Sequence, residues 1–143
     1  MKKIINITLL ILWMILIFTM SSFNATESGE QSGFIVNILS NVLHISNIEI
    51  LSLIVRKLAH FTEYLILGIL AINCFKDYDI KHIFIISLIF CIIYASSDEI
   101  HQLFIPGRSG NIIDATIDSL GALTGITMYY YLILKNKAFK KIS

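Results

Sequence analysis

Long apolar runs separated by short polar segments dominate the chain and predict an all-α integral membrane protein. Four stretches have the length and apolar character of transmembrane helices: residues 4–20, 58–75, 80–97 and 112–134. A helix needs roughly 20 apolar residues to cross the bilayer core. The first stretch exceeds the roughly 7–15 apolar residues of a signal peptide, so we expect a retained membrane helix. Residues 1–143 then form a single membrane domain.

The segment between the first two stretches is expected to lie outside the membrane. Residues 21–33 are polar and rich in Ser and Gly, which favours a mobile linker. Residues 34–43 repeat apolar positions with helical spacing and predict a short interfacial helix on the outer leaflet. Ser46 and Glu49 have the spacing of a capping box, which predicts a helix from residue 47 through to Phe75.

Composition and charge support this interpretation. Only 15% of the residues are charged, whereas a soluble domain carries about 25%. The net charge of +1 provides no basic surface, so nucleic acid is not an expected partner. Lys residues concentrate on one side of the predicted spans, which predicts four spans with cytoplasmic N- and C-termini. The basic residues left on the outer side are Arg56, Lys57 and Arg108.

Polar residues inside the predicted spans form three stripes with helical spacing. Each ionisable group in a span costs roughly 2.5–3.5 kcal/mol on insertion scales, so such a cluster needs a reason. All three stripes fall at the outer ends of their spans, and we expect them to converge on one polar cleft. The stripes are Arg56, His60, Glu63 and Tyr64; Asp98, His101 and Gln102; and Asp114, Asp118, Gly121 and Gly125.

The segment before the fourth span has the sequence of a tight turn. Pro106 and Gly107 suit a type II turn, which would direct Arg108 over the mouth of the cleft. Residues 109–111 would then present backbone N–H groups at the start of the fourth helix, where the helix dipole favours an anion.

Three ordered motifs resemble the VanZ-like family of bacterial membrane proteins, which is named for a teicoplanin-resistance protein. The motifs are Arg56-Lys57-x-x-His60-Phe61-x-Glu63-Tyr64, Asp98-Glu99-x-His101-Gln102-x-Phe104-x-Pro106-Gly107-Arg108 and Asp114-x-x-x-Asp118-x-x-Gly121-x-x-x-Gly125. The resemblance implies a multi-pass protein of the bacterial plasma membrane and cell envelope. For some members it implies lowered susceptibility to glycopeptide or lipoglycopeptide antibiotics. It implies no established reaction.

The first hypothesis for these residues is an enzyme that acts on an anionic, lipid-linked envelope component by hydrolysis or group transfer. His60 and His101 would be acid and base, oriented by Glu63 and Asp98. The predicted substrate-binding residues are Arg56, Lys57, Gln102 and Arg108, because Arg and Lys bind phosphate or carboxylate. The remaining carboxylates, which could hold Zn²⁺, Mn²⁺ or Mg²⁺ or play a structural part, are Glu99, Asp114 and Asp118.

Two alternatives stay open. The protein could be a non-catalytic binder that shields the lipid-linked target of the antibiotic. The polar cluster could instead be a buried network that holds three helices in register without turnover. Gly121 and Gly125 permit close helix packing, either within the chain or in a homodimer.

Overall fold

The computed structural model describes the backbone of residues 1–78, 80–108 and 110–142. Within these ranges it describes all side chains except those of residues 25, 26, 31 and 134–142. In this part of the chain the secondary structure is entirely helical. The helices are α1 (Lys2–Ser21), α2 (Ala25–Leu43), α3 (Ile48–Phe75), α4 (Ile83–Gln102) and α5 (Ile112–Ile142). The predicted all-α class is therefore confirmed.

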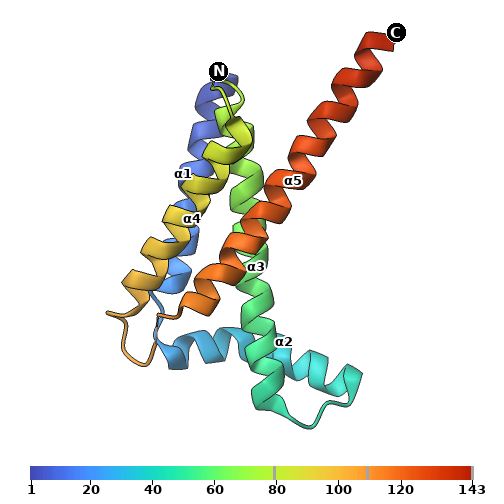
Figure 1. Cartoon of the computed structure of the whole chain (residues 1–143). Coiled ribbons are helices and arrows are strands. Elements are labelled where there is room, and N and C mark those ends of the chain that lie inside the picture. Colours follow the sequence, from blue (N-terminus) through green and yellow to red (C-terminus); the bar gives the residue numbers. More distant parts are fainter. Residues whose placement is uncertain (79, 109, 143) are drawn as a thin grey trace.

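The helices form a bundle with one helix lying across its end (Figure 1). Helices α1, α3 and α4 run along the length of the bundle, and α5 crosses α3 at an angle and packs mainly against it. The N-terminus and the end of α5 lie at one end of the bundle, while α2 runs across the other. This arrangement brings the start of α3, the end of α4 and the start of α5 together near α2.

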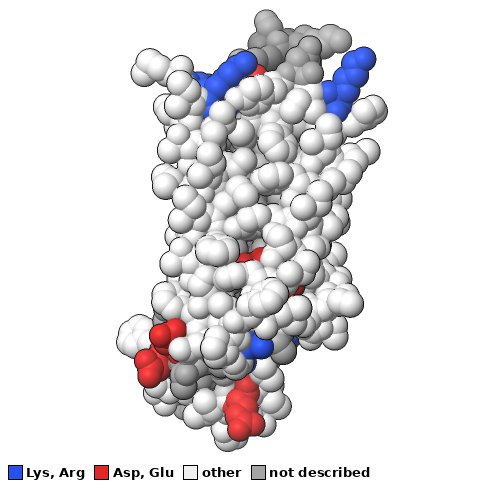
Figure 2. All heavy atoms as spheres, turned by 90° about the vertical axis from the view of Figure 1, so that its left-hand side faces the viewer, with Lys and Arg blue, Asp and Glu red and all other residues white. Residues whose placement is uncertain are grey.

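Three of the predicted membrane helices meet the requirements for a span. Helices α1, α3 and α4 are each long and apolar enough to cross a bilayer. The fourth predicted span, residues 112–134, lies inside the 31-residue helix α5 and stays a prediction. Figure 2 shows a broad, almost uncharged belt between two ends that carry charged side chains, as expected for a protein that sits in a membrane.

Helix α2 begins well before residue 34, so the prediction of a mobile linker over residues 21–33 was wrong. Asn24 caps the helix, because its side chain accepts a hydrogen bond from the Glu27 backbone N–H at 2.9 Å. The Glu27 carboxylate in turn accepts one from the Asn24 backbone N–H at 3.0 Å, which completes a capping box. This pair supports a helix start in a segment whose composition suggested a loop.

The boundaries of α3 and α4 also differ from the prediction. Asn47, and not Ser46, caps α3, since its side chain accepts from the Ile50 N–H at 3.2 Å. The end of α3 at Phe75 agrees with the prediction. Helix α4 starts three residues later than expected because His82 adopts a left-handed conformation with φ of 58°. It continues to Gln102 and not to residue 97.

Glycines on α5 allow it to approach α3 very closely. A Cβ added at Gly121 would overlap the carbonyl oxygen of Phe61, and one added at Gly125 would overlap that of Leu65. The predicted packing role of these two glycines is confirmed. In this structure α3 occupies the face of α5 that carries these glycines, and a homodimer stays a prediction.

Helix α1 is tied to the rest of the bundle by side-chain hydrogen bonds. Trp13 donates from its indole to the carbonyl oxygen of Glu63 at 2.9 Å. Tyr94 donates from its hydroxyl to the carbonyl oxygen of Met14 at 2.7 Å. These contacts attach α1 to α3 and α4, and its retention in the mature protein stays a prediction.

Candidate functional site

A cavity of about 380 Å³ lies at the end of the bundle near α2. Its walls come from α3, the end of α4, the α4–α5 loop and the start of α5. The predicted site residues that line it are Arg56, Lys57, His60, Glu99, Gln102, Arg108, Asp114 and Asp118. The predicted convergence of polar residues from three helices therefore occurs, although Glu63, Asp98 and His101 do not line the cavity.

Arg108 is held at the cavity by the predicted turn. Its backbone N–H donates to the carbonyl oxygen of Ile105 at 3.1 Å, and Gly107 has φ of 75°. These features are those of a type II turn, which needs a residue that tolerates positive φ. The guanidinium then donates to the carbonyl oxygen of Phe23 at 3.1 Å and to the side-chain oxygen of Gln102 at 3.5 Å.

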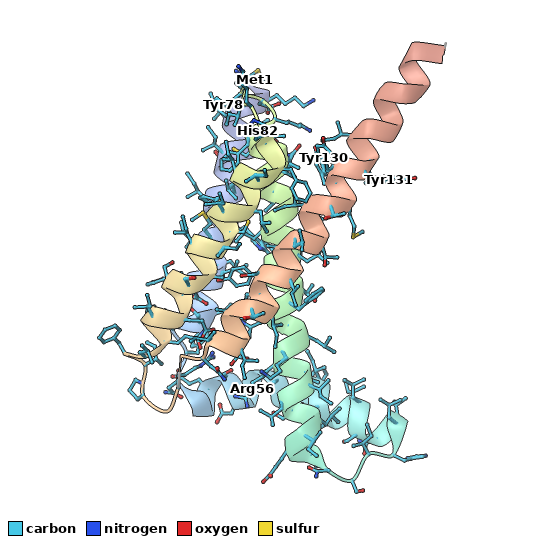
Figure 3. The ribbon with its side chains drawn as sticks, in the orientation of Figure 1. Met1, Arg56, Tyr78, His82, Tyr130 and Tyr131 are labelled. Atoms are coloured by element: carbon cyan, nitrogen blue, oxygen red, sulfur yellow. The ribbon has the colours of Figure 1, made fainter. Side chains whose placement is uncertain are left out.

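Two guanidinium groups at the cavity lack a carboxylate partner among the described residues. Arg108 bonds only to neutral oxygens, and Arg56 has no hydrogen bond or ion pair with any described residue. Figure 3 places Arg56 on α3 near the level of α2, far from Met1 and Tyr78. Burial and the neighbouring Arg56 lower the pKa of Arg108, although a guanidinium stays charged at neutral pH. A bound anion would compensate both charges.

The third basic residue of the cavity, Lys57, is already paired. Its ammonium group bonds to the carboxylate of Asp114 on α5. Both side chains are partly exposed, so this ion pair is partly screened by solvent. Lys57 is therefore less available for a ligand than either arginine.

The start of α5 binds a carboxylate of the protein itself. The backbone N–H of Asn111 donates to the Glu99 carboxylate at 2.7 Å. This contact corrects the expectation that the N–H groups before α5 face an external anion. Gly110 makes the approach possible, because an added Cβ would overlap the carbonyl oxygen of Glu99.

Asp98 and His101 turn toward α1 and away from the cavity. The Ser21 hydroxyl donates to Asp98 at 2.6 Å, and the Gln102 side chain donates to the same carboxylate at 3.4 Å. The His101 ring packs against Phe18 with their centroids 4.4 Å apart. Among the described residues, His101 and Asp98 therefore do not form the expected catalytic pair. Of the two imidazoles, His60 lines the cavity and His101 does not.

His60 is the histidine that lines the cavity. Its Nδ1 lies 3.9 Å from a carboxylate oxygen of Glu63 and 3.9 Å from one of Asp118. Both distances are too long for hydrogen bonds. Asp118 is fully buried, and neither of its carboxylate oxygens has a hydrogen-bond partner among the described residues. The structure thus places Asp118, and not Asp98, beside a histidine of the site.

The predicted metal ligands share the cavity but not a common centre. Among the described residues, no three His, Cys, Asp or Glu side chains are grouped closely enough to hold a metal ion. Asp114 pairs with Lys57 and Glu99 accepts the Asn111 N–H. A divalent metal stays a prediction without support from the geometry.

Several side chains and backbone groups of the site escaped the sequence analysis. The carbonyl oxygen of Phe23 anchors Arg108, and Ser21 partners Asp98. The Asn111 N–H was expected at the start of α5, but its partner, the Glu99 carboxylate, was not. Phe23 and Ser21 carry no comparable signal, since their roles depend on where α1 ends in space.

The fold and the cavity together define a helical membrane-type protein with a polar, mixed-charge cavity at one end of its bundle. A family model described as VanZ/LLP1 matches residues 6–135, and the chain belongs to this family. The name of this family refers to teicoplanin resistance. No curated protein and no solved structure matched the chain in the comparisons.

Proposed function

We propose that this protein is a four-span protein of the bacterial plasma membrane whose cavity binds the phosphate of a lipid-linked envelope component. The observation that carries the proposal is the pair Arg56 and Arg108. Both line the cavity, and neither is paired with a carboxylate of the described residues. Two guanidiniums can hold one phosphate through charge-assisted, bidentate hydrogen bonds.

The distribution of charge supports a cavity that opens on the extracytoplasmic side. The N-terminus and the end of α5 share the end of the bundle opposite α2 (Figure 1). Lys2, Lys3 and Lys76 belong to that end, and excess Lys and Arg mark the cytoplasmic side of a membrane protein. The cavity lies at the other end, and α2 then rests on the outer leaflet.

The size and walls of the cavity suit a head group. Ligand cavities commonly measure about 300–1,000 Å³, and this one is about 380 Å³. Apolar contacts come from Leu53 and Ile117 on its walls. Acyl or polyprenyl chains would remain in the bilayer beside α3 while the phosphate enters the cavity. Occupation of a lipid-linked target in this way would lower its availability to a glycopeptide antibiotic.

A second candidate function is hydrolysis or group transfer on the same lipid, with His60 as the acid–base group. It is favoured by the placement of His60, whose Nδ1 is buried between carboxylates while the side chain as a whole lines the cavity. The second ring nitrogen is then the one left for a ligand. In this candidate His101 has no catalytic part, because it packs on Phe18.

The proposed function is tested by lipid binding to purified protein. Phosphatidic acid is titrated onto the detergent-solubilised protein and followed by native mass spectrometry. We expect Arg56→Gln and Arg108→Gln each to weaken binding by about 10-fold or more, as for loss of a charged hydrogen bond. Lys3→Gln, at the opposite end, is the matched control and should bind as the wild type does. Equal binding by all four proteins would refute the proposal.

The second candidate needs a separate measurement. If His60 is an acid–base group, His60→Ala should abolish any turnover of the bound lipid while leaving phosphate binding largely intact. Loss of the antibiotic phenotype in Arg108→Gln but not in His60→Ala, at equal amounts of membrane protein, would instead identify a binder without chemistry.

A further inference from the structure

The inner end of the cavity has buried polar atoms without a hydrogen-bond partner among the described residues, and with the His60 proton on Nε2 all of them are acceptors. His60 Nδ1 and both carboxylate oxygens of Asp118 are buried and lack a hydrogen-bond partner among the described residues. Glu63 lies behind them and does not line the cavity, but one of its carboxylate oxygens is 3.9 Å from His60 Nδ1. Its side chain is 19% exposed and that of Asp118 is 0% exposed. Buried polar groups are nearly always satisfied, so this cluster requires an explanation.

The separations around His60 fit a shared donor. At 3.9 Å, Nδ1 is too far from either carboxylate oxygen for a direct hydrogen bond. A nitrogen placed between such atoms at about 2.9 Å from each would bond to both. An ammonium group has three N–H donors and no acceptor, and its charge also compensates the carboxylates. A metal ion would need its ligands at roughly 2.0–2.6 Å and a tighter group than the described residues provide.

The cavity therefore has two chemically different poles. Arg56 and Arg108 form a cationic pole without a carboxylate partner. His60, Glu63 and Asp118 form an acceptor pole without a donor. Both arginines, His60 and Asp118 line the same cavity. A purely anionic ligand would satisfy only one of these poles.

We propose that the ligand is zwitterionic, with a phosphate bound by Arg56 and Arg108 and a primary ammonium bound by His60, Glu63 and Asp118. This inference rests on the proposed function and names the class of its ligand: an aminoalkyl phosphate ester. Asp118 is fully buried in this structure but is among the residues that line the cavity together with His60, so a ligand in the cavity is next to both side chains. The same chemistry occurs in a lipid head group and in a soluble phosphoamine, and the two sources require separate tests.

The test compares three lipids with identical acyl chains on the full-length protein in detergent, by native mass spectrometry. Phosphatidylethanolamine has a phosphate and an ammonium with N–H donors, phosphatidylcholine has the same charges without those donors, and phosphatidic acid has no ammonium. We expect phosphatidylethanolamine to bind about 10-fold or more tightly than phosphatidylcholine. Soluble phosphoethanolamine is added as a competitor, and displacement of the lipid at equal concentration would identify a soluble ligand of the same chemistry.

Variants separate the two poles. Asp118→Asn should reduce phosphatidylethanolamine binding to the level of phosphatidylcholine while phosphatidic acid binding is kept, and Glu63→Gln should do so in part. Arg108→Gln should weaken the binding of all three lipids. Glu49→Gln, an exposed carboxylate in the first turn of α3, is the control. If Asp118→Asn does not fold, Glu63→Gln and the lipid comparison on the wild type decide the question.

The outcomes distinguish this inference from the proposed function. Equal binding of the three lipids, or preference for phosphatidic acid, would overturn the zwitterionic ligand and leave the phosphate site standing. Binding of none of them would overturn both. Preference for phosphatidylethanolamine that persists in Asp118→Asn and in Glu63→Gln would show that the ammonium lies elsewhere and would likewise overturn the assignment.

Discussion

Helices α3 and α5 pack so closely that Gly125 has no room for a larger side chain. Of the glycines with a close neighbour, it is the one at which an added Cβ would overlap most. An alanine Cβ at this position would overlap the carbonyl oxygen of Leu65. A backbone oxygen cannot move away by changing rotamer, so the two helices must separate. Overpacking of this kind costs about 1–3 kcal/mol, and the gain in helix propensity from Gly to Ala returns about 1 kcal/mol. We therefore expect Gly125→Ala to lower the free energy of unfolding by up to about 2 kcal/mol, and not to raise it.

The same substitution elsewhere in the chain serves as the control. An added Cβ at Gly33 in α2 would meet nothing within 4 Å. Gly33→Ala should therefore stabilise the protein or leave its stability unchanged, so one chemical change gives opposite signs at two sites. The separation of α3 from α5 in Gly125→Ala should also weaken ligand binding, because His60 and Asp118 face each other across this interface.

Trp13 provides the assay for Gly125→Ala. It is the only tryptophan of the chain, and its indole bonds across helices to the Glu63 carbonyl. Its fluorescence should therefore report loss of helix packing during unfolding in mixed detergent micelles. If Gly125→Ala stabilised the protein as much as Gly33→Ala does, the close approach of α3 and α5 would be refuted.

Three further changes follow from single contacts. Ser21→Ala removes the shorter of two hydrogen bonds donated to buried Asp98 and should cost about 2 kcal/mol; Ser21→Thr, which keeps the hydroxyl, should restore part of this in the same unfolding assay. His82→Gly relieves a left-handed conformation and should stabilise by about 1 kcal/mol, whereas an unchanged melting temperature would contradict the strain. Asn24→Ala removes the α2 cap and should speed amide exchange in the first turn of α2 alone; uniform exchange rates would count against it.

Local signals in the sequence predicted local features of the structure well. The apolar run that ends at Phe75 ends α3, and the Pro106–Gly107 pair forms the expected turn. Some of the polar residues at helical spacing on α3, α4 and α5 line one cavity. Each of these depends on neighbours within a few positions, so periodicity and turn chemistry are sufficient.

Partners across helices could not be predicted in the same way. Asp118 lies beside His60 because the glycines of α5 fix its register and distance against α3. Asp98 bonds to Ser21 because α1 ends next to α4. Neither the register of two helices nor the end of a third is encoded in the spacing along one helix. The start of α2 was missed for a different reason, since its cap at Asn24 outweighs a composition typical of loops.

The bond between Ser21 and Asp98 also has a consequence for how the protein is made. The two residues are 77 positions apart in the chain, which corresponds to about 4–15 s of synthesis at ordinary elongation rates. Helix α1 is therefore complete long before the acidic end of α4 leaves the ribosome. If α1 remains beside the insertion site, the carboxylate of Asp98 enters the bilayer with its partner already in place. A chain whose first helix drifted away would have to insert that carboxylate alone, at the cost of an unpaired charge.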